Sequence, residues 1–172
     1  MMYQPGDMII YGSTGVCEVK EITTPDFEKD KSKLYYALAP VYQDGVIYTP
    51  VDTKAFMRPV MTKEEVDALI DRIPTMETEV CYNRAPRELQ EHYDSYLKSH
   101  SCESLLVLVM SIYTKREDLL SQHRKFGAVD ERYMKRAEDL LYGELAAALE
   151  IERDAVPAYI ENAIENMESK KA

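Results

Sequence analysis

The sequence lacks features that define several large classes of proteins. It contains no tryptophan, and its three cysteines (Cys17, Cys81 and Cys102) are too few and too unevenly spaced for a disulfide framework. It has no run of about 18–20 apolar residues, the length that crosses a bilayer. Its first residues carry neither the basic nor the apolar segment of a signal peptide. These absences predict a protein of the reducing cytoplasm that has no contact with a membrane.

The composition is that of an ordinary globular protein with an acidic balance. Of the 172 residues, 45% are apolar and 30% are charged, which excludes a wholly disordered chain and a collagen-like fibre. The length suits one larger domain or two small ones. The formal net charge of −10 argues against strong independent binding to nucleic acid, because that function normally uses a strong positive field.

The first 60 residues have the pattern of short β-strands joined by tight turns. Turn residues at positions 12–15 and the pair Asp44–Gly45 separate apolar runs that are rich in β-favouring residues. Pro50 and Pro59 have no backbone N–H, so they belong at strand ends or on edge strands. Five strands are predicted, which favours a small barrel or a strongly bent sheet, at residues 8–11, 16–23, 34–42, 46–51 and 55–60.

From residue 62 onward the apolar residues recur at helical spacing. Thr62 and Glu65 match a capping box, which begins a helix that ends at Pro74. Asp130 is the expected N-cap of another helix. The remaining helices are predicted at residues 87–99, 102–122, 130–149 and about 154–167. The predicted fold class is therefore α+β, with a β domain at residues 1–60 and an all-α domain of about five helices at residues 61–172.

The sequence contains no recognised catalytic motif. A nucleophile elbow, a P-loop and a dinucleotide-binding glycine motif are all absent. Residues 12–15 join two predicted strands instead of beginning a helix, which favours a hairpin turn over a phosphate-binding loop. We therefore expect no enzyme activity, no cofactor and no small-molecule substrate. Five possible metal ligands are also present: His92, His100, His123, Cys81 and Cys102. Their spacing matches no metal-binding motif, so packed or surface positions are favoured for these side chains over a metal site.

The charges are distributed unevenly along the chain. Residues 84–136 hold 10 basic and 8 acidic residues, whereas the rest of the chain has a net charge of −12. The basic residues are densest on either side of the turn between the predicted helices at 102–122 and 130–149. Two helix ends that meet there would place these charges on one surface, and an ordinary solvated face is the alternative.

Several motifs, in their order along the chain, resemble the CarD family of bacterial transcription regulators. The resemblance begins in residues 3–22 (YQPGDMIIYGSTGVCEVKEI) and continues in residues 35–38 (YYAL) and 46–52 (VIYTPVD). In the helical half it is carried by residues 104–113, by residues 130–132 and most clearly by the stretch AEDLLYGELA at residues 137–146. It therefore covers nearly the whole chain.

The resemblance implies a Tudor-like (SH3-like) five-stranded β barrel that binds the β subunit of bacterial RNA polymerase. A related module occurs in the transcription-repair coupling factor. The resemblance also implies a helical domain that contacts promoter DNA and modulates the stability of the open complex, without catalysis or a cofactor. An incomplete barrel can pair an exposed strand with a partner's sheet. The expected polymerase-binding residues are Tyr35, Ile47, Tyr48, Thr49 and Met57.

On the DNA side the sequence departs from the family. Many members insert a tryptophan at the minor groove, and Tyr82 is the expected substitute here. A weak basic patch would contact promoter DNA only when polymerase holds it there. The absence of tryptophan and the negative net charge favour an alternative function: a polymerase-binding module that does not touch DNA. RNA binding is disfavoured because the β domain lacks a basic face. The expected phosphate contacts are Arg84, Arg87, Arg124, Lys125, Arg132 and Arg136.

Overall fold

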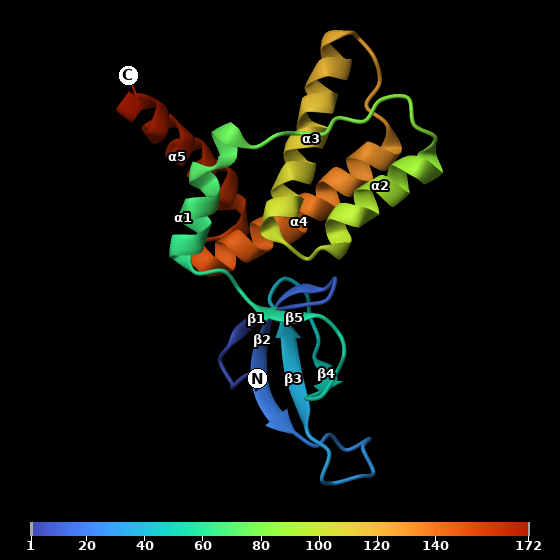
Figure 1. Ribbon diagram of the computed structural model, residues 1–172. Coiled ribbons are helices and arrows are strands. Elements are labelled where there is room, and N and C mark those ends of the chain that lie inside the picture. Colours follow the sequence, from blue (N-terminus) through green and yellow to red (C-terminus); the bar gives the residue numbers. More distant parts are fainter. Residues whose placement is uncertain (1, 172) are drawn as a thin grey trace. The chain divides into compact units, whose positions relative to one another are not determined.

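The chain forms two compact units that divide between Met61 and Thr62 (Figure 1). The computed structural model describes residues 2–171, and it describes side chains up to residue 166. Within these residues, no helix combines the length and the apolar character needed to cross a membrane. We call the first unit the β unit and the second the helical unit.

The β unit is a five-stranded antiparallel sheet with the strand order β4-β3-β2-β1-β5 (Figure 1). Strands β4 and β5 are therefore the two edges. As expected, Pro50 and Pro59 are the last residues of these edge strands. The strands are β1 (Met8–Tyr11), β2 (Gly15–Thr23), β3 (Tyr35–Pro40), β4 (Ile47–Pro50) and β5 (Met57–Pro59).

The sheet bends around a small apolar core. The register of β2 against β3 shifts between Val19 and Glu21, an irregularity that increases the local twist. The Tyr11 hydroxyl on β1 donates to Thr49 Oγ1 on β4 at 3.3 Å, although the two strands are not neighbours in the sheet. This side-chain contact requires a strongly curved sheet. The buried core consists of Ile9, Cys17, Val19, Tyr36 and Leu38.

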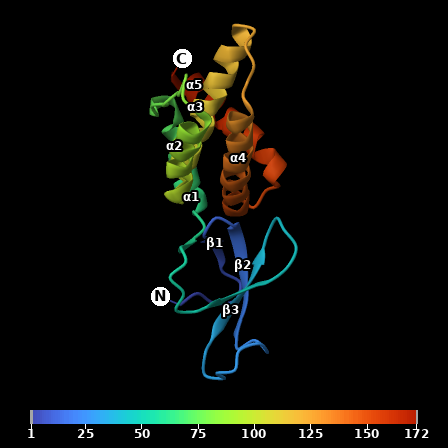
Figure 2. The same cartoon turned by 90° about the vertical axis from the view of Figure 1, so that its right-hand side faces the viewer.

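The helical unit contains five α-helices and two short 3₁₀ turns among the described residues (Figure 2). Together with the five-stranded sheet, these helices confirm the predicted fold class of a Tudor-like β domain followed by a helical domain. The elements are α1 (Lys63–Asp71), η1 (Ile73–Thr75), α2 (Pro86–Lys98), α3 (Cys102–Ser121), α4 (Ala128–Leu149), η2 (Arg153–Ala155) and α5 (Val156–Lys171).

Local sequence determines where most of these helices begin. Helix α1 has the predicted capping box: Thr62 Oγ1 accepts from the Glu65 N–H at 3.1 Å, and the Glu65 carboxylate accepts from the Thr62 N–H at 3.1 Å. The Ser101 hydroxyl caps α3 by accepting from the Ser104 N–H. Both caps satisfy backbone donors that the first helical turn leaves without partners.

The prediction that Asp130 caps the fourth helix is wrong. Helix α4 begins at Ala128 with Gly127 as its N-cap, so Asp130 lies inside the first turn. Its carboxylate is buried instead, where it accepts from the Tyr93 hydroxyl at 2.6 Å and pairs with Lys115 Nζ at 2.9 Å. These two long-range partners, on α2 and α3, hold the side chain away from the capping position.

Apolar faces of the helices pack into the core of the helical unit. The Tyr159 hydroxyl of α5 donates to Asp67 of α1 at 2.7 Å, and the Tyr133 hydroxyl of α4 donates to Asp94 of α2 at 2.8 Å. Polar bonds thus join elements that the core already packs together. The most deeply buried side chains of the unit include Val66, Ile70, Tyr93, Leu108, Ile112, Ala137, Leu141, Leu145 and Val156.

Candidate functional site

Strand β4 offers an open edge on the β unit. It pairs with β3 on one side, from Tyr35↔Pro50 to Leu38↔Ile47, and it has no neighbour on the other side within the described sheet. An edge strand presents unpaired backbone N–H and C=O groups that can pair with another chain. The residues predicted to form the exposed strand, Ile47, Tyr48 and Thr49, therefore lie on a true edge.

An aromatic cluster lies beside this edge. Tyr48 is 42% exposed and Phe27, in the β2–β3 loop, is 65% exposed. The two rings meet edge to face with centroids 5.9 Å apart, and Phe27 meets Tyr35 in the same way at 5.6 Å. Large exposed aromatic side chains are typical anchors of protein interfaces. The prediction from sequence missed Phe27, and an aromatic residue within the charged stretch at residues 25–33 was its only signal.

Not all of the predicted polymerase-binding side chains reach the surface. Tyr35 and Thr49 are buried, and Met57 is half-buried on β5, the opposite edge of the sheet. The Tyr35 hydroxyl donates to Glu28, and this bond holds the pKa of the Glu28 carboxyl below its ordinary value. Tyr35 and Thr49 therefore pack in the interior of the β unit, whereas Tyr48 is accessible to a partner.

Four of the seven predicted DNA-contacting residues line one hollow of about 410 Å³ in the helical unit. Segments far apart in sequence form it: the loop before α2, the end of α3 and the α3–α4 turn with the start of α4. The buried pair of Lys115 and Asp130 lies at its wall. The four predicted residues are Tyr82, Arg84, Arg124 and Lys125.

The ring of Tyr82 is held at its tip by an acidic side chain. Its hydroxyl donates to Asp118 Oδ2 on α3 at 2.6 Å, although the ring remains 39% exposed. The hydrogen bond to Asp118 is the main reason that the pKa of Tyr82 is raised. Insertion of this ring between bases would require the bond to break, so Asp118 restrains the predicted wedge.

The other three predicted DNA contacts do not line this hollow. Arg87 is exposed on α2 and pairs with Glu91 one turn later. Arg132 and Arg136 are exposed one turn apart on α4, and the Arg132 guanidinium lies 5.4 Å from the centre of the Tyr133 ring. The structure therefore separates the predicted basic surface into a hollow and a helix face.

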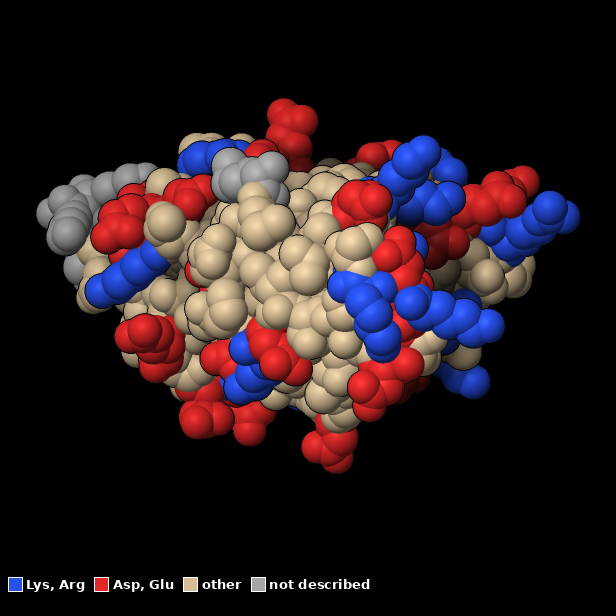
Figure 3. Space-filling view, turned by 90° about the horizontal axis from the view of Figure 1, so that it is seen from below, with Lys and Arg blue, Asp and Glu red and all other residues tan. Residues whose placement is uncertain are grey.

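The surface carries both signs of charge. On the face in Figure 3, basic and acidic side chains alternate around uncharged surface, and neither sign forms a continuous field. This face therefore lacks the broad positive field of a strong nucleic-acid binder.

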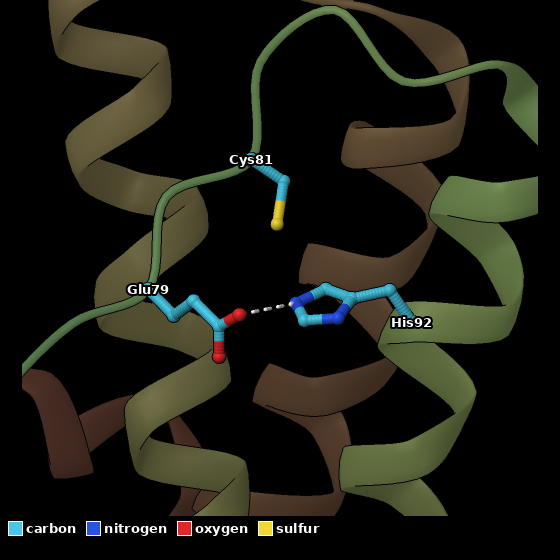
Figure 4. Close-up of side chains that lie close together, drawn as sticks. All are labelled: Glu79, Cys81 and His92. Atoms are coloured by element: carbon cyan, nitrogen blue, oxygen red, sulfur yellow. Dashed lines mark ion pairs between the residues drawn. The ribbon is translucent and has the colours of Figure 1, made fainter.

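Three possible metal ligands also converge in the helical unit (Figure 4). Glu79 and Cys81 come from the loop before α2 and His92 comes from α2 itself. One ligand atom from each side chain lies within 4.8 Å of the other two. The prediction from sequence considered Cys81 and His92 together with three other residues and favoured packed or surface positions, because their spacing matches no ligand motif; it did not consider Glu79 as a ligand.

Residues 3–61 match the family model of the CarD-like/TRCF RID domain. The β unit is therefore similar to the RNA polymerase-interacting domain shared by CarD-like proteins and the transcription-repair coupling factor, which supports binding to polymerase. The match ends where the β unit ends, so it leaves the helical unit outside the matched region. No curated protein sequence matches the chain.

Proposed function

We propose that this protein is a bacterial transcription regulator that binds RNA polymerase through its β unit. The observation that carries the proposal is the match of residues 3–61 to a polymerase-interacting domain. Such a domain acts by binding, so the proposal includes no catalysis and no cofactor. A protein with this role works in the cytoplasm, where the polymerase is.

The polymerase β subunit is the proposed partner, and the β4 edge with its aromatic cluster is the proposed contact. Main-chain bonds from an edge strand supply affinity, while side chains beside the strand supply specificity. Tyr48 and Phe27 suit the second role because both rings are exposed and each supports the other.

A binding assay between the full chain and the purified polymerase β-subunit lobe tests this contact. We expect the double variant Phe27→Ser/Tyr48→Asp to bind at least about 10-fold more weakly, because loss of interface aromatics typically costs more than about 1 kcal/mol. Tyr113→Ser, which changes an equally exposed tyrosine of the helical unit, is the matched control and should bind as the wild type does. Absence of binding by the wild type would refute the proposal.

The helical unit is proposed to contact promoter DNA in the polymerase complex and so to modulate the lifetime of the open complex. The hollow lined by Tyr82, Arg84, Arg124 and Lys125 supports this role, because three cations and an exposed ring surround it. Phosphates bind to such groups without sequence preference. Attachment to polymerase would supply the local concentration that weak contacts need.

Open-complex lifetimes with the cognate polymerase test the DNA contact. We expect Arg124→Glu/Lys125→Glu to remove most of the effect on lifetime while binding to the β-subunit lobe is unchanged. The pair Arg132→Glu/Arg136→Glu makes the same charge change on the α4 face, outside the hollow. Equal loss in both double variants would assign DNA contact to a wider surface than the hollow.

A second candidate function is a polymerase-binding module that does not touch DNA. The bond between Tyr82 and Asp118 favours it, since this carboxylate restrains the ring and adds negative charge near the hollow. This candidate predicts that both double variants keep the full effect on the open complex. The lifetime assay therefore discriminates between the two functions.

A further inference from the structure

One nitrogen of the helical unit has no hydrogen-bond partner. Among the described residues, His92 Nε2 is the buried side-chain nitrogen or oxygen that lacks one. Only 14% of the His92 side chain is exposed. A buried polar atom without a hydrogen-bond partner costs free energy, and a ligand bound at this nitrogen would remove that cost.

The atoms in front of this nitrogen are those of possible metal ligands. Glu79 Oε1 lies 3.9 Å from His92 Nε2, too far for a hydrogen bond (Figure 4). The Cys81 thiol completes a group whose ligand atoms all lie within 4.8 Å of one another. Glu79 and Cys81 are two residues apart in a loop, so an extended backbone directs both side chains to the same side.

These separations are close to those around a tetrahedral zinc ion. Zinc lies about 2.0–2.3 Å from nitrogen, oxygen and sulfur ligands, so ligand atoms at tetrahedral angles lie about 3.3–3.6 Å apart. Glu79 Oε1 and His92 Nε2 lie 3.9 Å apart, and no two of the three ligand atoms are more than 4.8 Å apart, so side-chain movements of up to about an ångström would bring all three into range. The set of one thiolate, one imidazole and one carboxylate favours zinc over calcium or magnesium, which prefer oxygen.

The surroundings hold the carboxylate in position. The second oxygen of Glu79 accepts from the Tyr96 hydroxyl at 2.9 Å, and the Glu79 backbone N–H donates to Ser111 Oγ at 2.9 Å. The Tyr96 ring also packs against the His92 imidazole with centroids 5.4 Å apart. Metal sites typically have such outer partners, which orient the ligands before the ion arrives.

We propose that Glu79, Cys81 and His92 bind one zinc-class divalent cation. The Cys81 thiol loses its proton to solvent as its sulfur bonds to the metal, and a water molecule supplies the fourth ligand. The Glu79 side chain is 59% exposed, so this position opens to solvent on its side. The bound ion fixes the loop before α2, which also carries Tyr82 and Arg84. The site does not depend on the proposed contact with polymerase.

Cobalt(II) is the direct probe, because a thiolate ligand gives it an intense sulfur-to-metal charge-transfer absorption band. We expect the full-length chain, reduced and freed of metal, to develop this band at one equivalent of Co²⁺ and to lose it when Zn²⁺ is added. Cys81→Ser should abolish the band. Cys17→Ala and Cys102→Ala should retain it, because these buried cysteines lie outside the site.

Affinity measurements separate a ligand from a structural residue. Tyr96→Phe keeps the ring and removes the bond to Glu79, so Zn²⁺ affinity should fall by about 10-fold, at the lower end of the usual effect of an outer partner. His92→Gln should weaken affinity more than this. In parallel, Zn²⁺ should raise the melting temperature of the wild type but not that of His92→Gln, and circular dichroism of each variant without metal reports whether it folds.

Two results would overturn the proposal. The first is a wild-type chain that shows no thiolate band with Co²⁺ and no thermal shift with Zn²⁺. The second is a band that persists in Cys81→Ser, since another cysteine would then be the ligand.

Discussion

Lys115 and Asp130 carry opposite charges in the interior of the helical unit. Their side chains are about 10% and 5% exposed, and the Tyr93 hydroxyl donates to the same carboxylate. A buried ion pair contributes little net stability, but removal of one partner leaves a charge in a medium that solvates it poorly. Since α2, α3 and α4 each supply one of these residues, the network couples the three helices.

We predict that Asp130→Asn destabilises the protein by about 3–5 kcal/mol, because Lys115 then remains buried without a counter-charge. Urea unfolding of the helical unit measures this loss. Lys115→Met combined with Asp130→Leu should cost less than Asp130→Asn alone, since neither charge remains. Lys135→Ala is the surface control: it breaks an exposed pair with Asp139 and should cost at most about 0.5 kcal/mol. A similar small effect for Asp130→Asn would contradict this account.

Cys17 makes the β unit sensitive to alkaline pH. Burial in the core raises the pKa of this thiol to about 11 from its ordinary value of 9.0. The unfolded chain therefore loses the proton first, so the stabilisation is complete below pH 9 and is lost as the pH rises to 11. We predict that wild-type stability falls by roughly 1–3 kcal/mol more than that of Cys17→Ala over this interval. Urea unfolding followed by far-ultraviolet circular dichroism at pH 8 and pH 11 measures the difference, and an equal loss of stability in the wild type and Cys17→Ala would exclude the effect.

At the scale of the element, Thr62 shows how local chemistry positions a helix. Its hydroxyl and the Glu65 carboxylate satisfy each other's backbone donors at the start of α1. We predict that Thr62→Ala lowers the free energy of unfolding of the helical unit by about 1 kcal/mol. Thr78→Ala, an exposed threonine outside the helices, is the matched control and should change it by less than about 0.5 kcal/mol. Equal effects of the two substitutions would show that the capping box does not stabilise α1.

Most elements could be predicted to within a few residues because their signals are local. The two-residue period of the strands, the helical spacing after Thr62 and the capping box all depend on neighbours in sequence. The start of α4 could not be predicted, since Asp130 has the residue type of a cap but bonds to Lys115 and Tyr93. A capping residue competes with tertiary partners, and no local pattern reports those partners.

At the scale of the whole molecule, the net charge of −10 limits what the hollow can do alone. Arg84, Arg124 and Lys125 are exposed cations that line it. Few phosphate contacts give weak, strongly salt-dependent binding. The proposed DNA contact is therefore one that only attachment to polymerase makes effective.

We predict that the purified protein binds free duplex DNA with a dissociation constant above about 10⁻⁴ M at physiological salt, which is the weak end of non-specific binding. Fluorescence anisotropy of a labelled duplex measures it. As salt is lowered, the logarithm of the association constant should rise with a slope of magnitude near 3 against the logarithm of salt concentration, because about three phosphates are neutralised. Arg124→Glu/Lys125→Glu should abolish the residual binding. Tight binding of the wild type at moderate salt would contradict the prediction.

The sequence by itself determined the two-part plan, the secondary structure and the position of the basic excess, because each depends on residues near one another in the chain. It also indicated that β4 is an edge strand, since Pro50 lacks a backbone N–H and belongs at a strand end or on an edge. Only the tertiary structure decided that Tyr82, Arg84, Arg124 and Lys125 line one hollow, or that Cys81 lies near His92. These residues come from an irregular loop and from helices packed against it, and such a loop has no period that would reveal where its side chains point.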